Sequence, residues 1–230
     1  MFKHLFLIFL YLVLLPINVQ TTKKIKTMKL RNLFIALTAV AAMYSCGPSE
    51  KPAEKVNTDS VAVTYNVIAD SSTIGWKGTM VGVYSHNGTV KLKDGSLTLT
   101  GGKLTAGTFT IDMKTITPLD SNYNEKDHKK EFLVGHLSAP DFFSTDTFPT
   151  ASFVVKSVEG TTATGDLTIK GKTNSEKVTD LVLTSDSSSV SATGKLVFDR
   201  QKYGVAYKPT MKDMVLSNDI EISISLKGKK

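Results

Sequence analysis

Cysteine is almost absent from this sequence, since Cys46 is the only one among its 230 residues. A single thiol excludes a disulfide framework within the chain, and it excludes any metal site built from several thiolates. Phosphate-binding glycine loops, nucleophile elbows and the HExxH pattern are also missing. Because no convergent catalytic set is visible, we expect no enzyme, no metal site and no cofactor.

An excess of positive charge is missing from most of the chain, although the formal net charge is +7. Residues 1–45 carry six lysines and arginines and no acidic residue. The rest of the chain holds 22 basic and 21 acidic side chains, a net charge of about +1. The excess of basic residues therefore lies in residues 1–45, and the charge of the remaining chain does not favour binding to a nucleic acid.

A hydrophobic run long enough to cross a bilayer is missing too. The apolar runs at residues 5–17 and 33–44 are both shorter than the roughly 18–20 residues that a membrane span needs. The second run follows basic residues and ends in small residues before Cys46, which is typical of a lipoprotein signal peptide. We therefore interpret residues 28–45 as that signal and Cys46 as the lipidated residue. The alternative is an uncleaved anchor with a chance cysteine.

These boundaries organise the rest of the chain. Residues 1–27 precede a complete signal, so we interpret them as a mis-annotated upstream extension, with translation starting at Met28. Residues 46–60 are polar, contain two prolines and show no periodicity, which is typical of a flexible tether. Residues 61–230 remain as one folded domain. The mature protein is expected to be exported and lipid-anchored at the bacterial cell envelope, facing the periplasm or the cell surface.

Apolar and polar residues alternate through most of this domain. In the clearest case Ile220, Ile222, Ile224 and Leu226 alternate with Glu221, Ser223, Ser225 and Lys227. A period of two is typical of strands with one buried face, and turn residues separate the alternating runs. No long crossover helix is indicated, so the pattern predicts an all-β, antiparallel fold, either a sandwich or a closed barrel.

One stretch breaks the alternation. Residues 121–135 are charged and carry a sparse apolar stripe, which predicts a short helix that ends at Gly135. A loop bounded by Pro140 and Pro149 follows, and prolines cannot take part in a central strand ladder. Phe142 and Phe143 lie in this loop, where they would either gate one end of a cavity or cap the core.

Several pieces of the domain resemble the YceI-like family, exported lipocalin-like proteins that bind polyisoprenoid lipids. They are "STIGWKGTMVGVYSHNGTV", "GKLTAGTFTIDMKTI", "KKEFLVGHLSAPDFFSTDTFPTASFVV", "ATGDLTIKGKTNSEKVTDLVL", "FDRQKYGV" and "DIEISISL". Together they cover residues 61–228 in the family's order. The segment "AYKPTMKDMVLSN" departs from the family pattern, which leaves the identity of the ligand open.

The resemblance implies an eight-stranded antiparallel lipocalin-like barrel with a short helical insertion and an apolar cavity. It implies binding, storage or transport of a polyisoprenoid lipid or an isoprenoid quinone at the cell envelope, and it leaves a homodimer open. Two alternatives remain: a structural or interaction module whose barrel is filled by its own side chains, and a lipid-modifying enzyme.

Candidate ligand-binding residues are the aromatic side chains and one histidine near the insertion. They are Trp76, Phe109, Phe132, His136, Phe142, Phe143, Phe153, Tyr203 and Tyr207. Among them His136, Tyr203 and Tyr207 are expected to contact a headgroup at a mouth of the barrel. Trp76 has two readings, a core anchor and a ligand contact. A zinc site is not expected, because zinc needs three or four convergent ligands.

Overall fold

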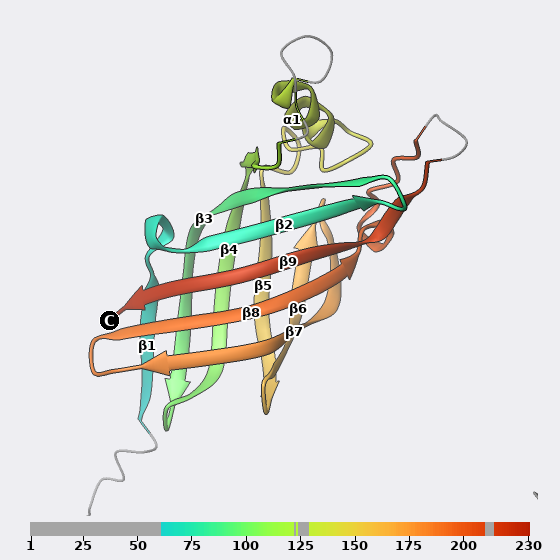
Figure 1. Cartoon of the computed structure of the whole chain (residues 1–230). Helices are drawn as coiled ribbons and strands as arrows, with labels where there is room; N and C mark the ends of the chain where they lie inside the picture. The colour runs from blue at the N-terminus through green and yellow to red at the C-terminus, as the bar shows by residue number, and fades with distance from the viewer. Residues whose placement is uncertain (1–60, 122, 124–128, 210–213) are drawn as a thin grey trace, which may run out of the picture. The chain divides into compact units, whose positions relative to one another are not determined.

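The computed structural model describes residues 61–121, 123, 129–209 and 214–230 (Figure 1). The interpreted upstream extension, signal peptide, Cys46 and tether lie outside these residues and stay predictions. Within the described ranges, no helix has the length and apolar character that crossing a membrane requires.

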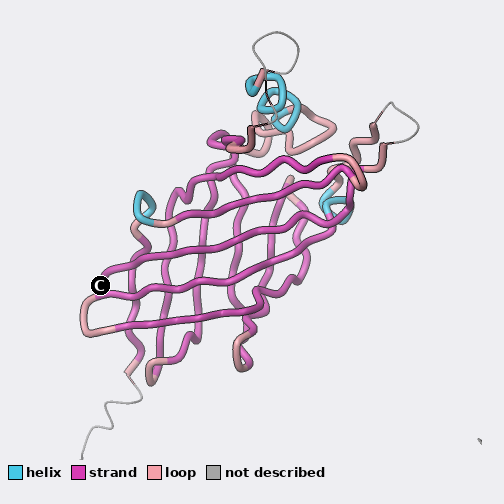
Figure 2. Tube along the Cα trace, viewed as in Figure 1, coloured by secondary structure: helices cyan, strands magenta, loops and turns pink. Residues whose placement is uncertain are grey.

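The described residues are mostly strands, with one α-helix and two 3-10 turns (Figure 2). In chain order the elements are β1 (Ala62–Val67), η2 (Ala69–Ser71), β2 (Thr73–Met80), β3 (Tyr84–Thr100), β4 (Lys103–Pro118), α1 (Lys130–Ser138), β5 (Thr150–Glu159), β6 (Thr162–Ile169), β7 (Lys172–Ser185), β8 (Ser189–Asp199), η3 (Arg200–Tyr203) and β9 (Leu216–Lys229).

Every neighbouring pair of strands is antiparallel. The sheet closes into a barrel because β3, which pairs with β1 and β2, also pairs with β4. The segments β1 and β2 share one position in the wall. Residues 96–100 of β3 pair with β1, residues 84–90 pair with β2, and both short strands also pair with β9. The turn η2 interrupts this position. The predicted eight-stranded antiparallel barrel is therefore confirmed.

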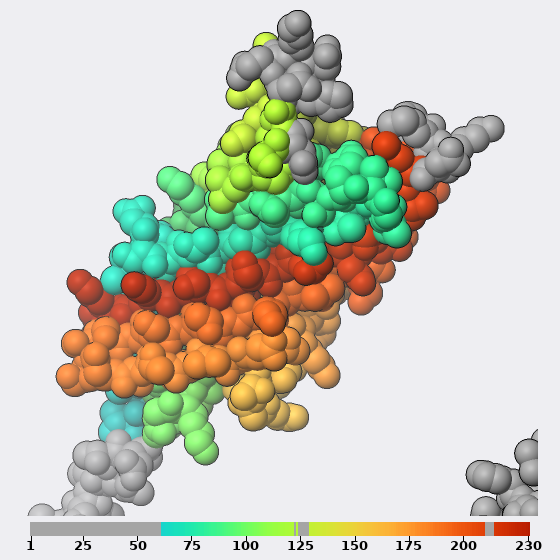
Figure 3. Space-filling model, viewed as in Figure 1, coloured from blue at the N-terminus to red at the C-terminus, as the bar shows by residue number. Residues whose placement is uncertain are grey.

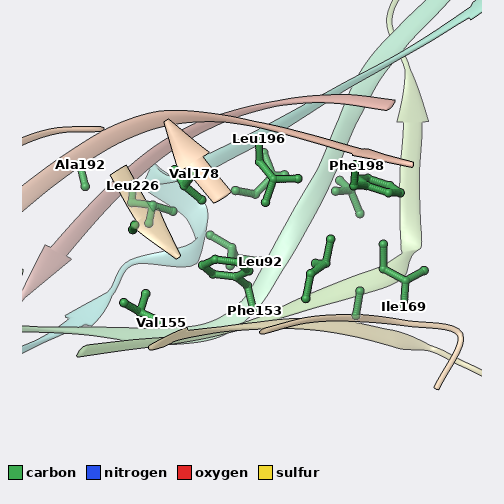
Figure 4. Close-up of a cluster of buried hydrophobic side chains, with 14 of the residues drawn as sticks. Leu92, Phe153, Val155, Ile169, Val178, Ala192, Leu196, Phe198 and Leu226 are labelled. Carbon is green, nitrogen blue, oxygen red and sulfur yellow. The ribbon is translucent and has the colours of Figure 1, made fainter. Parts of the chain in front are cut away.

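Side chains alternate between the inside and the outside of the barrel as the sequence pattern predicts. In β9, the apolar set from Ile220 to Leu226 lines the interior, whereas Glu221, Ser223 and Ser225 are exposed. Figure 4 shows Leu92, Phe153 and Leu196, from three different strands, directed into the space inside the wall. Viewed from outside, side chains cover the wall formed by β2, β9, β8 and β7 without an opening (Figure 3).

The predicted helix is displaced along the sequence. Part of the predicted segment lies outside the described residues, and α1 runs from Lys130 through Gly135 to Ser138. The expected end at Gly135 is therefore wrong. Pro140 sets the end instead, because a residue before proline is pushed out of the helical region. Ala139 accordingly has extended backbone angles, with φ −69° and ψ 164°.

Gly88 allows Trp76 to lie across a neighbouring strand. The two residues face each other in the β2–β3 pair, and the Trp76 indole Nε1 donates a hydrogen bond to the Thr89 carbonyl at 3.1 Å. A Cβ atom at position 88 would lie 2.6 Å from Cζ2 of Trp76 and would collide with the Thr117 carbonyl oxygen. The backbone oxygen cannot move without breaking the pairing of β3 with β4.

We predict that Gly88→Ala lowers the free energy of unfolding by about 1–3 kcal/mol, the usual cost of overpacking. Gly78→Ala is the matched control in the same strand pair, because a Cβ there would meet only Ile220 Cδ1 at 3.8 Å. Urea unfolding of the two variants and the parent measures the difference. Equal stability of the two variants would show that Gly88 is not required for close packing.

Candidate ligand-binding cavity

The barrel encloses a cavity of about 300 Å³. Every strand from β2 to β9 contributes to its lining, together with α1, the loop that follows α1, and the segment after η3. Almost all of the lining is apolar; its polar members are Tyr84, His86, His136, Thr193, Arg200 and Tyr207. The volume lies at the lower end of the range of small-molecule sites, and a barrel filled by its own side chains would lack it.

Seven of the nine predicted ligand-binding residues line this cavity. They are Trp76, Phe109, His136, Phe142, Phe143, Phe153 and Tyr207. For Trp76 the two readings merge, because the packed wall and the cavity lining are the same surface. Whether any of these residues contacts a ligand stays a prediction.

Phe132 does not line the cavity. Its side chain is 60% exposed. The inner face of α1 is formed by Leu133, His136 and Leu137, which follow the i, i+3, i+4 spacing of one helix face. Phe132 lies on the flank of this face, one turn before His136, and its exposed side chain is not part of the lining, unlike the other aromatic candidates nearby.

Tyr203 does not reach a mouth of the cavity either. It is fully buried beside the barrel wall, where its hydroxyl donates to Glu176 Oε1 at 3.1 Å and its ring packs edge-on against Phe198. Burial, followed by the charge of Glu176, raises the pKa of Tyr203. The residue holds η3 against β7 and β8, which is a structural role rather than the headgroup contact that the sequence suggested.

Four side chains form an aromatic cap at the α1 end of the barrel: His136, Phe142, Phe143 and Tyr207. The His136 ring lies edge-on to Tyr207 at 4.4 Å and to Phe142 at 4.8 Å between centroids. Phe142 also packs on Tyr207 and on Phe143. All four line the cavity, so the phenylalanines cap the core and border the ligand space at once.

Backbone hydrogen bonds hold this cap in place. The loop after α1 folds back on the helix, with the Phe143 amide donating to the Leu137 carbonyl at 3.1 Å. The Tyr207 amide donates to the Asp141 carbonyl at 3.2 Å, which joins this loop to the segment after η3. Lys170 joins the same two segments, because its ammonium donates to the carbonyls of Pro140 and Gly204. Burial, with the nearby charge of Lys172, lowers the pKa of Lys170.

Among the described residues, Arg200 is the one formally charged member of the lining, and its guanidinium donates hydrogen bonds to backbone carbonyls. Its Nη1 donates to the carbonyls of Val205 and Tyr207 at 2.6 and 3.1 Å, and its Nε donates to the Ser217 carbonyl at 3.0 Å. Burial lowers the pKa of Arg200, and the nearby Asp199 acts in the opposite direction. The side chain is 97% buried (3% exposed) and ties the segment after η3 to the start of β9.

Two polar residues of the lining, His86 and Arg200, are not among the candidate ligand-binding residues that the sequence indicated. Among the residues that the structure describes, no three His, Cys, Asp or Glu side chains converge as a metal site. Strand alternation could have placed His86 on the inner face, since it lies four residues before the buried Val90.

Comparison with known proteins identifies the family to which this barrel belongs. The family model of the YceI-like domain matches residues 65–228, which is most of the chain. The chain belongs to the YceI-like family. A UPF0312 protein of Staphylococcus aureus strain USA300 is 34% identical over 128 residues, covering 51% of this chain and 71% of the relative.

Solved structures also match this chain at low sequence identity, and one of them, with a TM-score above 0.5, shares the barrel fold. BcnA of Burkholderia cenocepacia superposes with a TM-score of 0.53 and 19% identity, over 70% of this chain and 98% of BcnA. A polyisoprenoid binding domain from Saccharophagus degradans, implicated in plant cell wall breakdown, gives a TM-score of 0.48 and 13% identity over 72% of this chain and 97% of that domain.

The capped end of this YceI-like barrel also carries exposed apolar side chains. Val81, Val83, Leu119, Phe132 and Val215 are each more than half exposed. They lie in the β2–β3 turn, after β4, on α1 and before β9, and the Val81 amide donates to the Val215 carbonyl at 2.8 Å. Val81, Val83 and Val215 directly adjoin lining residues in the sequence, namely Met80, Tyr84 and Leu216.

We predict that Arg200→Met lowers the free energy of unfolding by at least about 2 kcal/mol, because several buried carbonyls lose their donor. Lys208→Met, in the segment after η3 and with an exposed side chain, is the control and should change stability by less than about 0.5 kcal/mol. Thermal and urea unfolding test both variants. A parent-like Arg200→Met would mean that the guanidinium does not hold the capped end together.

Proposed function

We propose that this YceI-like protein binds a polyisoprenoid-type lipid in its barrel cavity and stores or carries it at the cell envelope. The observation that carries the proposal is the lining: about 300 Å³ of space inside the barrel, bordered almost entirely by apolar side chains. The proposed activity is binding rather than catalysis.

The physical chemistry of the lining favours a long apolar chain. Burial of apolar surface contributes about 25 cal/mol per Å², and it needs no directed contacts. A ligand made of repeated hydrocarbon units therefore gains affinity from every wall of the cavity. A ligand with many polar groups would lose its hydrogen bonds to water and find few replacements.

The length of the lining favours a slender chain. Within β4 the lining residues extend from Leu104 to Ile116, which corresponds to roughly 40 Å of extended strand. An isoprenoid tail is narrow, and it can follow such a path without a wide opening. The strands tilt around the barrel axis, so the path along the axis is shorter than the strand itself.

We propose that the ligand exchanges with a membrane at the capped end. Exposed apolar side chains at this end, such as Val81, Val83 and Val215, would lie against lipid more readily than polar ones. In our proposal, acyl chains on Cys46 keep the barrel near the bilayer, and residues 46–60 supply the reach. Two acyl chains are enough for a stable anchor, whereas one is marginal.

Narrowing the deep part of the cavity tests the binding function. Ala192 lines the cavity near the start of β8, remote from η3, and is 3% exposed. Ala192→Phe should remove a long-chain lipid that copurifies with the parent, with at least a tenfold loss of lipid per mole of protein. Mass spectrometry of organic extracts measures it.

Ser191→Phe is the matched control. Ser191 directly precedes Ala192 and is exposed on the outer face of the barrel, so this variant places the same ring outside the cavity. This variant should retain the lipid, and a thermal melt should show that both variants are folded. Retention of a long-chain lipid by Ala192→Phe would contradict the cavity as the binding site, as would a parent protein with no apolar lipid in any extract.

The proposed lipid anchor on Cys46 is tested separately from the cavity. Cys46→Ala in the full chain should move the protein from the membrane fraction to the soluble fraction, because the acyl chains are the strong membrane attachment in this account. Ser49→Ala, three residues further along the tether, should leave the fractionation unchanged. If Cys46→Ala stays with the membrane as the parent does, the lipoprotein interpretation fails.

A further inference from the structure

One polar cluster interrupts the apolar lining of the cavity. The His86 Nδ1 atom lies 3.1 and 3.2 Å from the two carboxylate oxygens of Asp120, and 3.1 Å from the Tyr123 hydroxyl. The Tyr123 hydroxyl also donates to Asp120 Oδ2 at 2.9 Å. The side chain of Asp120 is only 7% exposed, so the carboxylate is held within the protein by its donors.

The hydrogen bonds fix which nitrogen of His86 carries the proton. A carboxylate only accepts, so the contact with Asp120 requires a proton on Nδ1. The Asn87 amide donates to the same carboxylate at 3.2 Å. Burial, then the hydrogen bond to Asp120 and its charge, raises the pKa of Tyr123, which keeps that hydroxyl a donor.

Two aromatic rings fix the orientation of the imidazole. Tyr84 meets His86 edge-on at 5.1 Å between centroids, and Tyr123 stacks on it at 5.6 Å with an interplanar angle of 17°. Tyr84 and His86 both line the cavity. The ring is therefore held on one edge by Asp120 and on its sides by tyrosines.

The second ring nitrogen of His86 remains accessible. The structure shows no hydrogen bond to Nε2 in the described part of the chain, and no buried side-chain polar atom there lacks a partner. Nε2 is therefore an accessible atom, and the His86 residue that carries it lines the cavity. In the neutral ring this nitrogen is an acceptor, because the single proton is on Nδ1.

We propose that His86 Nε2 accepts a hydrogen bond from a terminal hydroxyl of the lipid, so that the preferred ligand is a prenyl-type alcohol. This inference rests on the proposed function, and it assigns the polar end of the ligand to the β2–β3 side of the cavity. Asp120 and Tyr123 position the imidazole and do not contact the ligand, and Tyr84 borders the cavity beside the imidazole.

The charge and polarity of the cluster separate an alcohol from other prenyl lipids. A phosphate or diphosphate would approach the buried carboxylate of Asp120, and like charges at short range repel. An ether or a quinone carbonyl only accepts hydrogen bonds, so it offers no donor to Nε2. His136 is a weaker candidate, because its Nε2 already lies 3.7 Å from Asp141 and its ring is packed in the aromatic cap.

The test compares three probes with the same twenty-carbon chain: geranylgeraniol, its methyl ether and geranylgeranyl diphosphate. Calorimetric titration of the full chain should give a roughly tenfold preference for the alcohol over the ether, the size of one buried hydrogen bond, and weaker binding of the diphosphate. His86→Leu should reduce the preference to within twofold while the ether still binds. His86→Gln retains an acceptor and should retain part of the preference.

The outcomes separate this inference from the proposed function. If the ether binds the parent as tightly as the alcohol, if the diphosphate binds more tightly than either, or if His86→Leu keeps the full preference, the role of His86 is overturned and lipid binding stands. If none of the three probes binds the parent, the proposed function fails and this inference fails with it. Thermal melts of both variants establish that they are folded.

Discussion

The pairing of β3 with β4 is the interaction on which the rest of the structure depends. The two long strands close the sheet, so that no edge is left between the first and last wall positions. Irregular register at three points along β3 bends the strand around the barrel. An open sheet could fold onto itself and fill its inner face, whereas closure keeps opposite walls apart and leaves an apolar space between them.

The capped end needs a different kind of support, because loops rather than a sheet ladder form it. Backbone carbonyls there would lack partners, and two cationic side chains supply the donors. Arg200 joins the segment after η3 to β9, and Lys170 joins the same segment to the loop after α1. Both cations are used for positioning, which leaves the lining itself almost wholly apolar and suited to a hydrocarbon chain.

Strand alternation predicted an antiparallel all-β fold, because it records directly which side chains face inward, as in β9; the resemblance to the YceI-like family implied the barrel. Seven of the nine candidate ligand-binding residues, chosen because they lie near the insertion, line the cavity. The two exceptions depend on how α1 and η3 are placed: Phe132 is exposed on the flank of α1, and Tyr203 is carried into the core by η3. His86 was overlooked because its partner Asp120 is 34 residues away, and only folding brings the two together.

The central claim is that the affinity for a lipid comes from its apolar chain inside the barrel. Trp76 is the only tryptophan and lines the cavity, so its fluorescence reports occupancy. Isoprenoid quinones with one headgroup and tails of increasing length should quench it saturably at one ligand per chain, with affinity rising as each isoprene unit buries more surface. Affinity that does not change with tail length, or quenching that does not saturate, would contradict the account.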